Sequence, residues 1–186
     1  MEYSRIKTKQ DLQEWLNEEK KIYGDSNIAS FLLIKEIDIL RRHLVLLRKT
    51  EYYVNTNNRV LATIYQICLK RLQNRYALHI ALNTCGVGLN IAHVGPIIIN
   101  SDARIGKNMR IHVGVNIGAN YCGDKAPRLG DNIYIAPGAK LFGDIEIASN
   151  VVIGANAVVN KSCYTQGAIL VGVPAKEHNP KGDVKE

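Results

Sequence analysis

Three histidines, His79, His93 and His112, stand out among the residues of this sequence that could do chemistry. An imidazole can take a proton from a hydroxyl as a general base, ligate a metal ion, or lie in a core with its ring nitrogens satisfied. Gaps of 14 and 19 residues separate the three, and no carboxylate supports them locally, which disfavours a metal site. The other two histidines, His43 and His178, are interpreted as surface or packing residues.

The elements that must position these histidines follow from a six-residue period that begins after residue 78. Twelve of the thirteen positions in one register carry a small or aliphatic side chain, and His93 is the exception. The period indicates the hexapeptide repeat of a parallel β-helix. Its positions are Ala81, Val87, His93, Ile99, Ile105, Ile111 and Ile117, followed by Leu129, Ile135, Leu141, Ile147, Ile153 and Val159.

Such a repeat has a direct physical basis. Each unit supplies one short strand and one corner, three units close a triangular coil, and stacked coils pair their backbones at a spacing of about 4.8 Å. The aliphatic position fills the axis of the coil, while Gly and Asn in stretches such as GKN (106–108) and PGA (137–139) tolerate the dihedrals of the corners. The expected fold is therefore mainly β.

His93 occupies an axial slot of this register, between Val87 and Ile99. A buried imidazole without partners costs about 1–3 kcal/mol, so the ring must either be satisfied in the core or leave it. The residues that follow, Val94, Gly95 and Pro96, can break the regularity of the coil. A local break would expose the ring in a groove between subunits.

The chain before residue 78 has helical spacing instead. Apolar residues follow Thr8, which with Asp11 has the pattern of a capping box, and further amphipathic runs cover 28–47 and 60–72. We expect an α-helical region over 1–77, the β-helix over 78–176 and a tail over 177–186. The stretch 48–53, rich in Arg and Tyr, is interpreted as a solvated or packing surface.

Composition restricts the functional classes. A net charge of +7 without a dense basic run or nucleic-acid motif disfavours nucleic-acid binding. The four cysteines are scattered, without the paired spacing of a zinc or redox site. No apolar run approaches the roughly 18 residues of a membrane span, and no leader pattern is evident, so we expect a soluble cytoplasmic protein.

Three segments carry a resemblance to a known family: GVGLNIAHVGPIIINSDARIGKNMRIHVGVNIG (86–118), LGDNIYIAPGAKLFGDIEIASNVVIGANAVV (129–159) and VGVPAK (171–176). Together they resemble the hexapeptide-repeat acyltransferases, in the branch of serine acetyltransferases and capsular polysaccharide O-acetyltransferases. The resemblance covers about residues 76–178. It implies a left-handed β-helix, a homotrimer, and acetyl-CoA bound in grooves between subunits.

The same resemblance implies roles for individual residues. His93 matches the general base of these enzymes, and His112 is a second candidate that contacts the base or the acceptor. Small residues along the pantetheine arm match Gly118, Pro137, Gly143 and Ala155, while Lys161 and Lys176 are candidates for its phosphates. Backbone N–H groups near the histidine would meet the oxyanion. No metal is expected.

Two departures from the serine acetyltransferase pattern bear on the acceptor. An Asp that orients the base precedes it in those enzymes, whereas this chain reads Leu78, His79, Ile80 and Ala81 there. A histidine that holds the amino acid is replaced by Ala126. We therefore expect a glycan hydroxyl as acceptor, with L-serine as the alternative.

Two other functional classes stay open. A non-catalytic β-helix scaffold would not need a histidine in an axial slot. A metal enzyme similar to the carbonic anhydrases that share the fold would use His79, His93 and His112, and a metal analysis would identify it.

Overall fold

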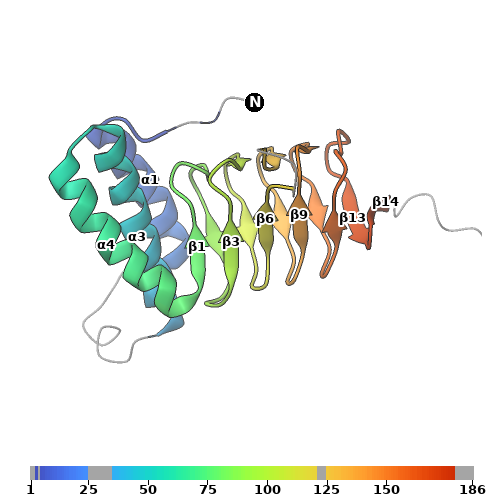
Figure 1. Cartoon of the computed structure of the whole chain (residues 1–186), viewed down its shortest axis with the longest axis horizontal. Coiled ribbons are helices and arrows are strands. Elements are labelled where there is room, and N and C mark those ends of the chain that lie inside the picture. Colours follow the sequence, from blue (N-terminus) through green and yellow to red (C-terminus); the bar gives the residue numbers. More distant parts are fainter. Residues whose placement is uncertain (1–2, 4, 25–34, 121–124, 179–186) are drawn as a thin grey trace, which may run out of the picture.

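The computed structural model describes residues 3, 5–24, 35–120 and 125–178. The three helices among these described residues form one end of an elongated molecule, and the β-coils stack from there along the long axis to a hairpin at the other end (Figure 1). Among the described residues, no helix has the length and apolar character needed to cross a membrane.

Helices α1 and α4 lie close to the expected positions, whereas α3 is shifted toward the C-terminus. Helix α1 (Lys9–Tyr23) starts at the capping box, in which Thr8 Oγ1 accepts from the Asp11 amide and the Asp11 carboxylate accepts from the Thr8 amide. Helix α3 (Glu36–Asn55) begins later than the amphipathic run at 28–47, and residues 25–34 lie outside the described part. Helix α4 (Arg59–Tyr76) covers the third run.

The β-helix has three sheets, and each full coil contributes one strand to each of them. Sheet A contains β1 (Leu78–Ile80), β3 (Ile97–Ile99), β6 (Asn116–Gly118), β9 (Lys140–Phe142) and β12 (Val158–Val159). Sheet B contains β4 (Arg104–Ile105), β7 (Arg128–Leu129) and β10 (Glu146–Ile147). Sheet C contains β2 (Asn90–Ile91), β5 (Arg110–Ile111), β8 (Tyr134–Ile135), β11 (Val152–Ile153), β13 (Ile169–Gly172) and β14 (Ala175–His178).

The axial core follows the six-residue register in the later coils. Ile111 pairs with Ile135 and Ile135 with Ile153, and all three side chains are fully buried. The corners use the conformations expected of their Asn and Gly residues, since Asn108 and Gly138 have φ angles of 57° and 77°. The fold is a left-handed parallel β-helix with an N-terminal α-helical region.

The register differs in the first coil, and the prediction that His93 occupies an axial slot is wrong. Ile91 pairs with Ile111 and fills that slot, while Ile99 pairs with Ile117. Eight residues therefore separate Ile91 from Ile99, against six between Ile111 and Ile117. The two extra residues push the segment from His93 to Pro96 outward. Upstream, Ile80 and Cys85 pair with the next coil in place of the expected Ala81 and Val87.

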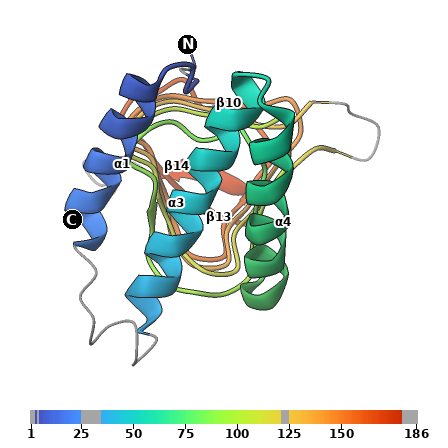
Figure 2. The ribbon, with the colours of Figure 1, turned by 90° about the vertical axis from the view of Figure 1, so that its left-hand side faces the viewer.

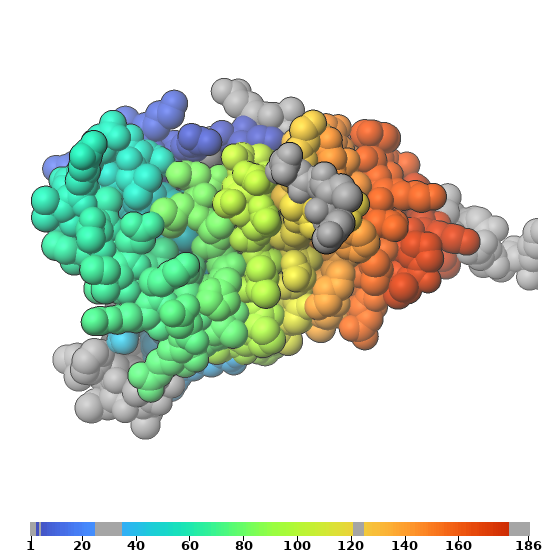
Figure 3. All heavy atoms as spheres, in the orientation of Figure 1, coloured from blue at the N-terminus to red at the C-terminus, as the bar shows by residue number. Residues whose placement is uncertain are grey.

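The helices cover the open end of the first coil. Figure 2 shows α1, α3 and α4 side by side across the triangular outline of the coils. Arg48 of α3 is completely buried there. It donates to the Cys85 carbonyl oxygen over 2.9 Å and to the Gly86 carbonyl oxygen over 2.8 Å. The space-filling view shows the coils as successive bands that begin at these helices (Figure 3). The first coil is thus held by the helical region.

Candidate active site

His93 lies where the chain turns from sheet C to sheet A. We call this edge the C–A corner, formed by residues 92–96, 112–115, 136–139 and 154–157 of successive coils. The His93 side chain is 61% exposed because the two extra residues displace it from the core. The break expected from Val94, Gly95 and Pro96 therefore exposes the ring.

A carboxylate from the helical region contacts His93. Glu36, the first residue of α3, places Oε2 3.4 Å from His93 Nδ1, and its Oε1 accepts a 2.6 Å hydrogen bond from the Val94 amide. The Val94 bond and, to a lesser extent, the imidazole lower the pKa of Glu36, so the carboxylate is ionised at neutral pH. Sequence reasoning missed Glu36 because 57 residues separate it from His93. An acidic residue at a helix start was the one local signal.

Helix α1 supports the strand that leads to His93. The Tyr23 hydroxyl donates to the Ile91 carbonyl over 3.0 Å and accepts from the Ile91 amide over 2.5 Å. Burial raises the pKa of Tyr23, which keeps the phenol protonated for this donation. The backbone two residues before His93 is thereby tied to the helices.

His112 follows β5 and lies one coil beyond His93 on the same corner. The two imidazole centroids are 6.3 Å apart, and His112 also packs 5.2 Å from the ring of Tyr134. Its Nε2 is buried and has no hydrogen-bond partner among the described residues. Burial first, then the charges of Arg110 and His93, lower the pKa of His112, so its ring is neutral at neutral pH.

The residues expected along the pantetheine arm fall into two groups. Pro137 and Ala155 lie on the C–A corner with the histidines, where the Asn156 amide donates to the Pro137 carbonyl over 2.9 Å. Gly118 and Gly143 lie at the next corner, between sheets A and B, joined by a 3.2 Å bond from the Gly143 amide to the Gly118 carbonyl. One face of sheet A separates the two groups.

The two expected phosphate-binding lysines are both exposed and lie on different strands at different corners. Lys161 follows β12 at the A–B corner, in the coil beyond Gly143, because Val159 pairs with Leu141. Lys176 lies on β14, opposite Val171 in the terminal hairpin. Lys161 therefore lies one coil beyond Gly143, and Lys176 lies two strands beyond Gly154, the neighbour of Ala155.

The residues that depart from the serine acetyltransferase pattern are buried. Leu78 is fully buried on β1, and Ala126 is 1% exposed at the start of the turn into β7. A carboxylate at residue 78 would therefore point into the core of this chain, not toward His93. Among the described residues, no group of three His, Cys, Asp or Glu side chains could hold a metal ion.

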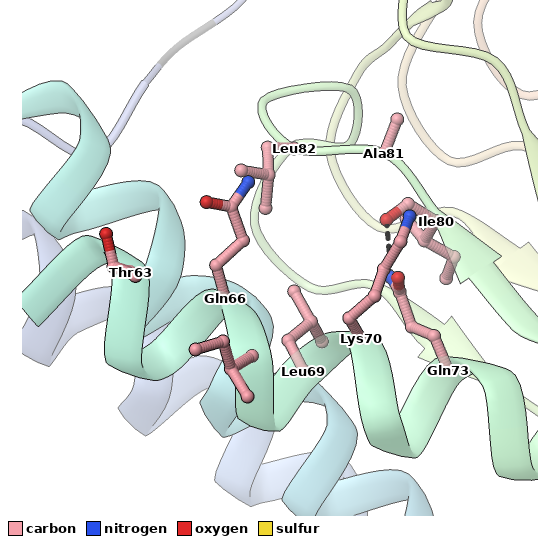
Figure 4. A pocket seen from close by; sticks show the side chains of 9 residues that line it. Thr63, Gln66, Leu69, Lys70, Gln73, Ile80, Ala81 and Leu82 are labelled. Atoms are coloured by element: carbon pink, nitrogen blue, oxygen red, sulfur yellow. Dashed lines mark hydrogen bonds between the residues drawn. The ribbon is translucent and has the colours of Figure 1, made fainter.

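A separate groove of about 470 Å³ lies between α4 and the first coil, away from His93. Figure 4 shows Gln66, Leu69 and Gln73 facing Ile80, Ala81 and Leu82, with Gln73 bonded to the Ile80 carbonyl over 2.9 Å. Lys70 is the one ionisable side chain among the described residues that line it. This groove therefore contains no carboxylate or imidazole among its described lining residues.

Comparisons with known proteins match part of the sequence and most of the fold. No protein-family model matches the chain. Serine acetyltransferases of Staphylococcus aureus (strain Mu50) and Staphylococcus xylosus are each 42% identical to it over 91 residues, which is 48% of this chain. The chain spans only 42% of the length of these curated relatives in that match.

Solved structures resemble a larger part of the chain. The serine acetyltransferase of Neisseria gonorrhoeae, solved in complex with serine, has a TM-score of 0.68 and 25% identity, covering 92% of this chain and 70% of its own. The soybean enzyme complexed with serine has the same TM-score at 21% identity, covering 90% and 69%. Fold and sequence together relate this chain to the hexapeptide-repeat acyltransferases, the family that contains the serine acetyltransferases.

Proposed function

We propose that this protein is an O-acetyltransferase that uses acetyl-CoA as its acetyl donor. The observation that carries the proposal is an exposed His93 whose Nδ1 faces the ionised carboxylate of Glu36. With the Nδ1 proton directed at Glu36, Nε2 is the basic nitrogen and faces away from the carboxylate. An acceptor hydroxyl needs such a base, because it is a poor nucleophile while protonated.

The reaction needs no covalent enzyme intermediate. Acetyl-CoA supplies the acetyl group as a thioester, and the acceptor oxygen attacks its carbonyl carbon as His93 Nε2 takes the hydroxyl proton. The C–S bond then breaks, and the imidazolium returns the proton to the leaving thiolate. The Val94 amide is committed to Glu36, so the oxyanion donor must be another N–H group.

We propose L-serine as the acceptor, ahead of the glycan that the sequence favoured. The relatives and structural neighbours described above are serine acetyltransferases, and two of those structures contain serine. The argument for a glycan also assumed that no carboxylate orients the base, whereas Glu36 contacts it. The remaining support for a glycan is Ala126, which leaves one expected contact to the amino acid unmade.

A trimer with the site between protomers belongs to the same proposal. The expected acetyl-CoA residues lie on two corners of one protomer, with Pro137 and Ala155 beside the histidines and Gly118 and Gly143 across sheet A. A groove between neighbouring protomers would bring the C–A corner of one against the A–B corner of the next. Light scattering should give a trimer mass at micromolar concentration, and a stable monomer would contradict the shared groove.

The test of the activity is thiol release from acetyl-CoA, measured with L-serine, free sugars and capsular-type oligosaccharides as acceptors. Saturable release with millimolar L-serine is the expected result. Efficient release only with oligosaccharides would restore the glycan acceptor. Absence of release with every acceptor would favour the scaffold alternative.

A further inference from the structure

Glu36 is placed to do more than neutralise a charge beside His93. Its carboxylate contacts two consecutive residues of the C–A corner, the His93 ring through Oε2 and the Val94 amide through Oε1. The 2.6 Å bond from Val94 fixes one oxygen, so the second oxygen has little freedom except toward Nδ1. Both side chains remain accessible, at 49% exposed for Glu36 and 61% for His93.

The helix that carries Glu36 is itself anchored to the β-helix. At positions further along α3, His43 Nε2 lies 3.2 Å from the Leu78 carbonyl oxygen, and Arg48 donates to the carbonyls of Cys85 and Gly86. These contacts attach α3 to the coil that contains His93. The start of the helix is therefore held at a defined place above the corner.

We infer that Glu36, a residue of the helical region, is the positioning residue of the acetyl transfer. It holds the His93 ring with Nδ1 protonated and Nε2 available as the base. This inference rests on the proposed function. It assigns part of the active site to the helices, and it explains how the chain can have Leu78 where its relatives' pattern has a carboxylate.

The alternative is that Glu36 only holds the loop through Val94. The two roles separate in Glu36→Gln. The amide oxygen of Gln can keep the bond from the Val94 amide, and its NH₂ group then faces Nδ1. Nδ1 must accept in that arrangement, so the ring proton moves to Nε2 and the base is lost. A loop-holding role alone would survive this substitution.

The experiment compares the full-length wild type with Glu36→Gln, Glu36→Asp and Asp38→Asn. The last removes one carboxylate charge from the same turn of α3, where Asp38 pairs with Arg41, and serves as the matched control. For Glu36→Gln we expect kcat to fall roughly 10²-fold, with the KM for acetyl-CoA within about 2-fold. Glu36→Asp keeps the charge and should recover at least about 10-fold of this loss, while Asp38→Asn should stay near wild type.

A second measurement is independent of turnover. The ¹⁵N chemical shifts of His93 report which ring nitrogen carries the proton, and we expect the Nδ1–H tautomer in the wild type and Nε2–H in Glu36→Gln. A wild-type kcat in Glu36→Gln, or an unchanged tautomer, would overturn the inference. If the wild type releases no thiol with any acceptor, the proposed function fails, and the tautomer still decides whether Glu36 orients the ring.

Discussion

Arg48 and Glu19 form a buried ion pair between α3 and α1, with Arg48 Nη2 2.7 Å from Glu19 Oε1. Arg48 Nη1 also lies 2.9 Å from Glu51 Oε2, and Arg48 Cζ lies 4.7 Å from the centroid of the Trp15 ring. Together with the bonds to Cys85 and Gly86, these contacts satisfy an arginine that is fully buried. Arg48, the first residue of the stretch 48–53, is thus a packing residue. Packing was one of the two interpretations given for this stretch.

Replacing Arg48 by Met should therefore destabilise the protein strongly. The substitution removes the guanidinium that pairs with two buried carboxylates and donates to two carbonyl oxygens, so we expect a loss of about 3–5 kcal/mol of unfolding free energy. Urea unfolding measures it. Arg42→Met, on the exposed side of the same helix, is the control and should change stability by less than about 0.5 kcal/mol. A loss below about 1 kcal/mol for Arg48→Met would refute the anchoring role.

His93→Ala should abolish most turnover without harming the fold. We expect kcat to fall roughly 10²- to 10⁴-fold because the general base is removed. The melting temperature should stay within about 2 °C, since the ring is 61% exposed and makes few packing contacts. Thiol release and thermal unfolding give the two values, with His79→Gln on β1 as a control. Retained activity with a lowered melting temperature would mean that His93 has only a structural role.

His112→Phe tests whether this residue contacts the acceptor. Phe keeps an aromatic ring against Tyr134 but removes both ring nitrogens, of which the buried Nε2 has no partner among the described residues, while the His93 ring centroid lies 6.3 Å away. Loss of one hydrogen bond to the acceptor should raise its KM about 10-fold, while the KM for acetyl-CoA stays the same. Steady-state kinetics with each substrate varied in turn gives the KM for the acceptor and the KM for acetyl-CoA separately. Unchanged kinetics would leave His112 as a packing residue.

His43 should make stability depend on pH. Burial lowers its pKa from an ordinary value of 6.5 to about 4. Below pH 6.5 the His43 ring binds a proton in the unfolded chain, but in the folded chain it stays neutral until about pH 4. The contribution of His43 to the free energy of unfolding is therefore complete above pH 6.5 and declines as the pH falls toward 4. This group alone should cost about 2 kcal/mol between pH 7 and pH 5.

The control for this effect is His43→Gln, whose amide can still donate to the Leu78 carbonyl. Urea unfolding at pH 7 and pH 5, at one protein concentration, should show the wild type losing about 2 kcal/mol more than the variant. Equal losses in both proteins would mean that His43 is not the titrating group.

The sequence by itself determined the features that repeat or act locally. The six-residue period places Ile105, Ile111 and Ile117 in the core because each coil presents the same inward slot to the next. Thr8 and Asp11 start α1 because a capping box needs only residues three apart. Asn108 lies at a corner of the coil because Asn tolerates the positive φ angle that the corner requires. The exposure of His93 was foreseeable in part, from the residues Val94, Gly95 and Pro96 that follow it.

Only the tertiary structure decided what the candidate active site contains. The pairing of Ile91 with Ile111 shows that the first coil has two extra residues after Ile91. The six-residue period alone does not distinguish such a shifted coil from a regular coil with an unusual residue in its axial slot. Glu36 meets His93 because contacts made further along α3, by Arg48 with Cys85 and Gly86, seat the helix on the first coil. Such a contact joins residues 57 apart through packing that has no sequence period, so it arises only when helices and coils assemble.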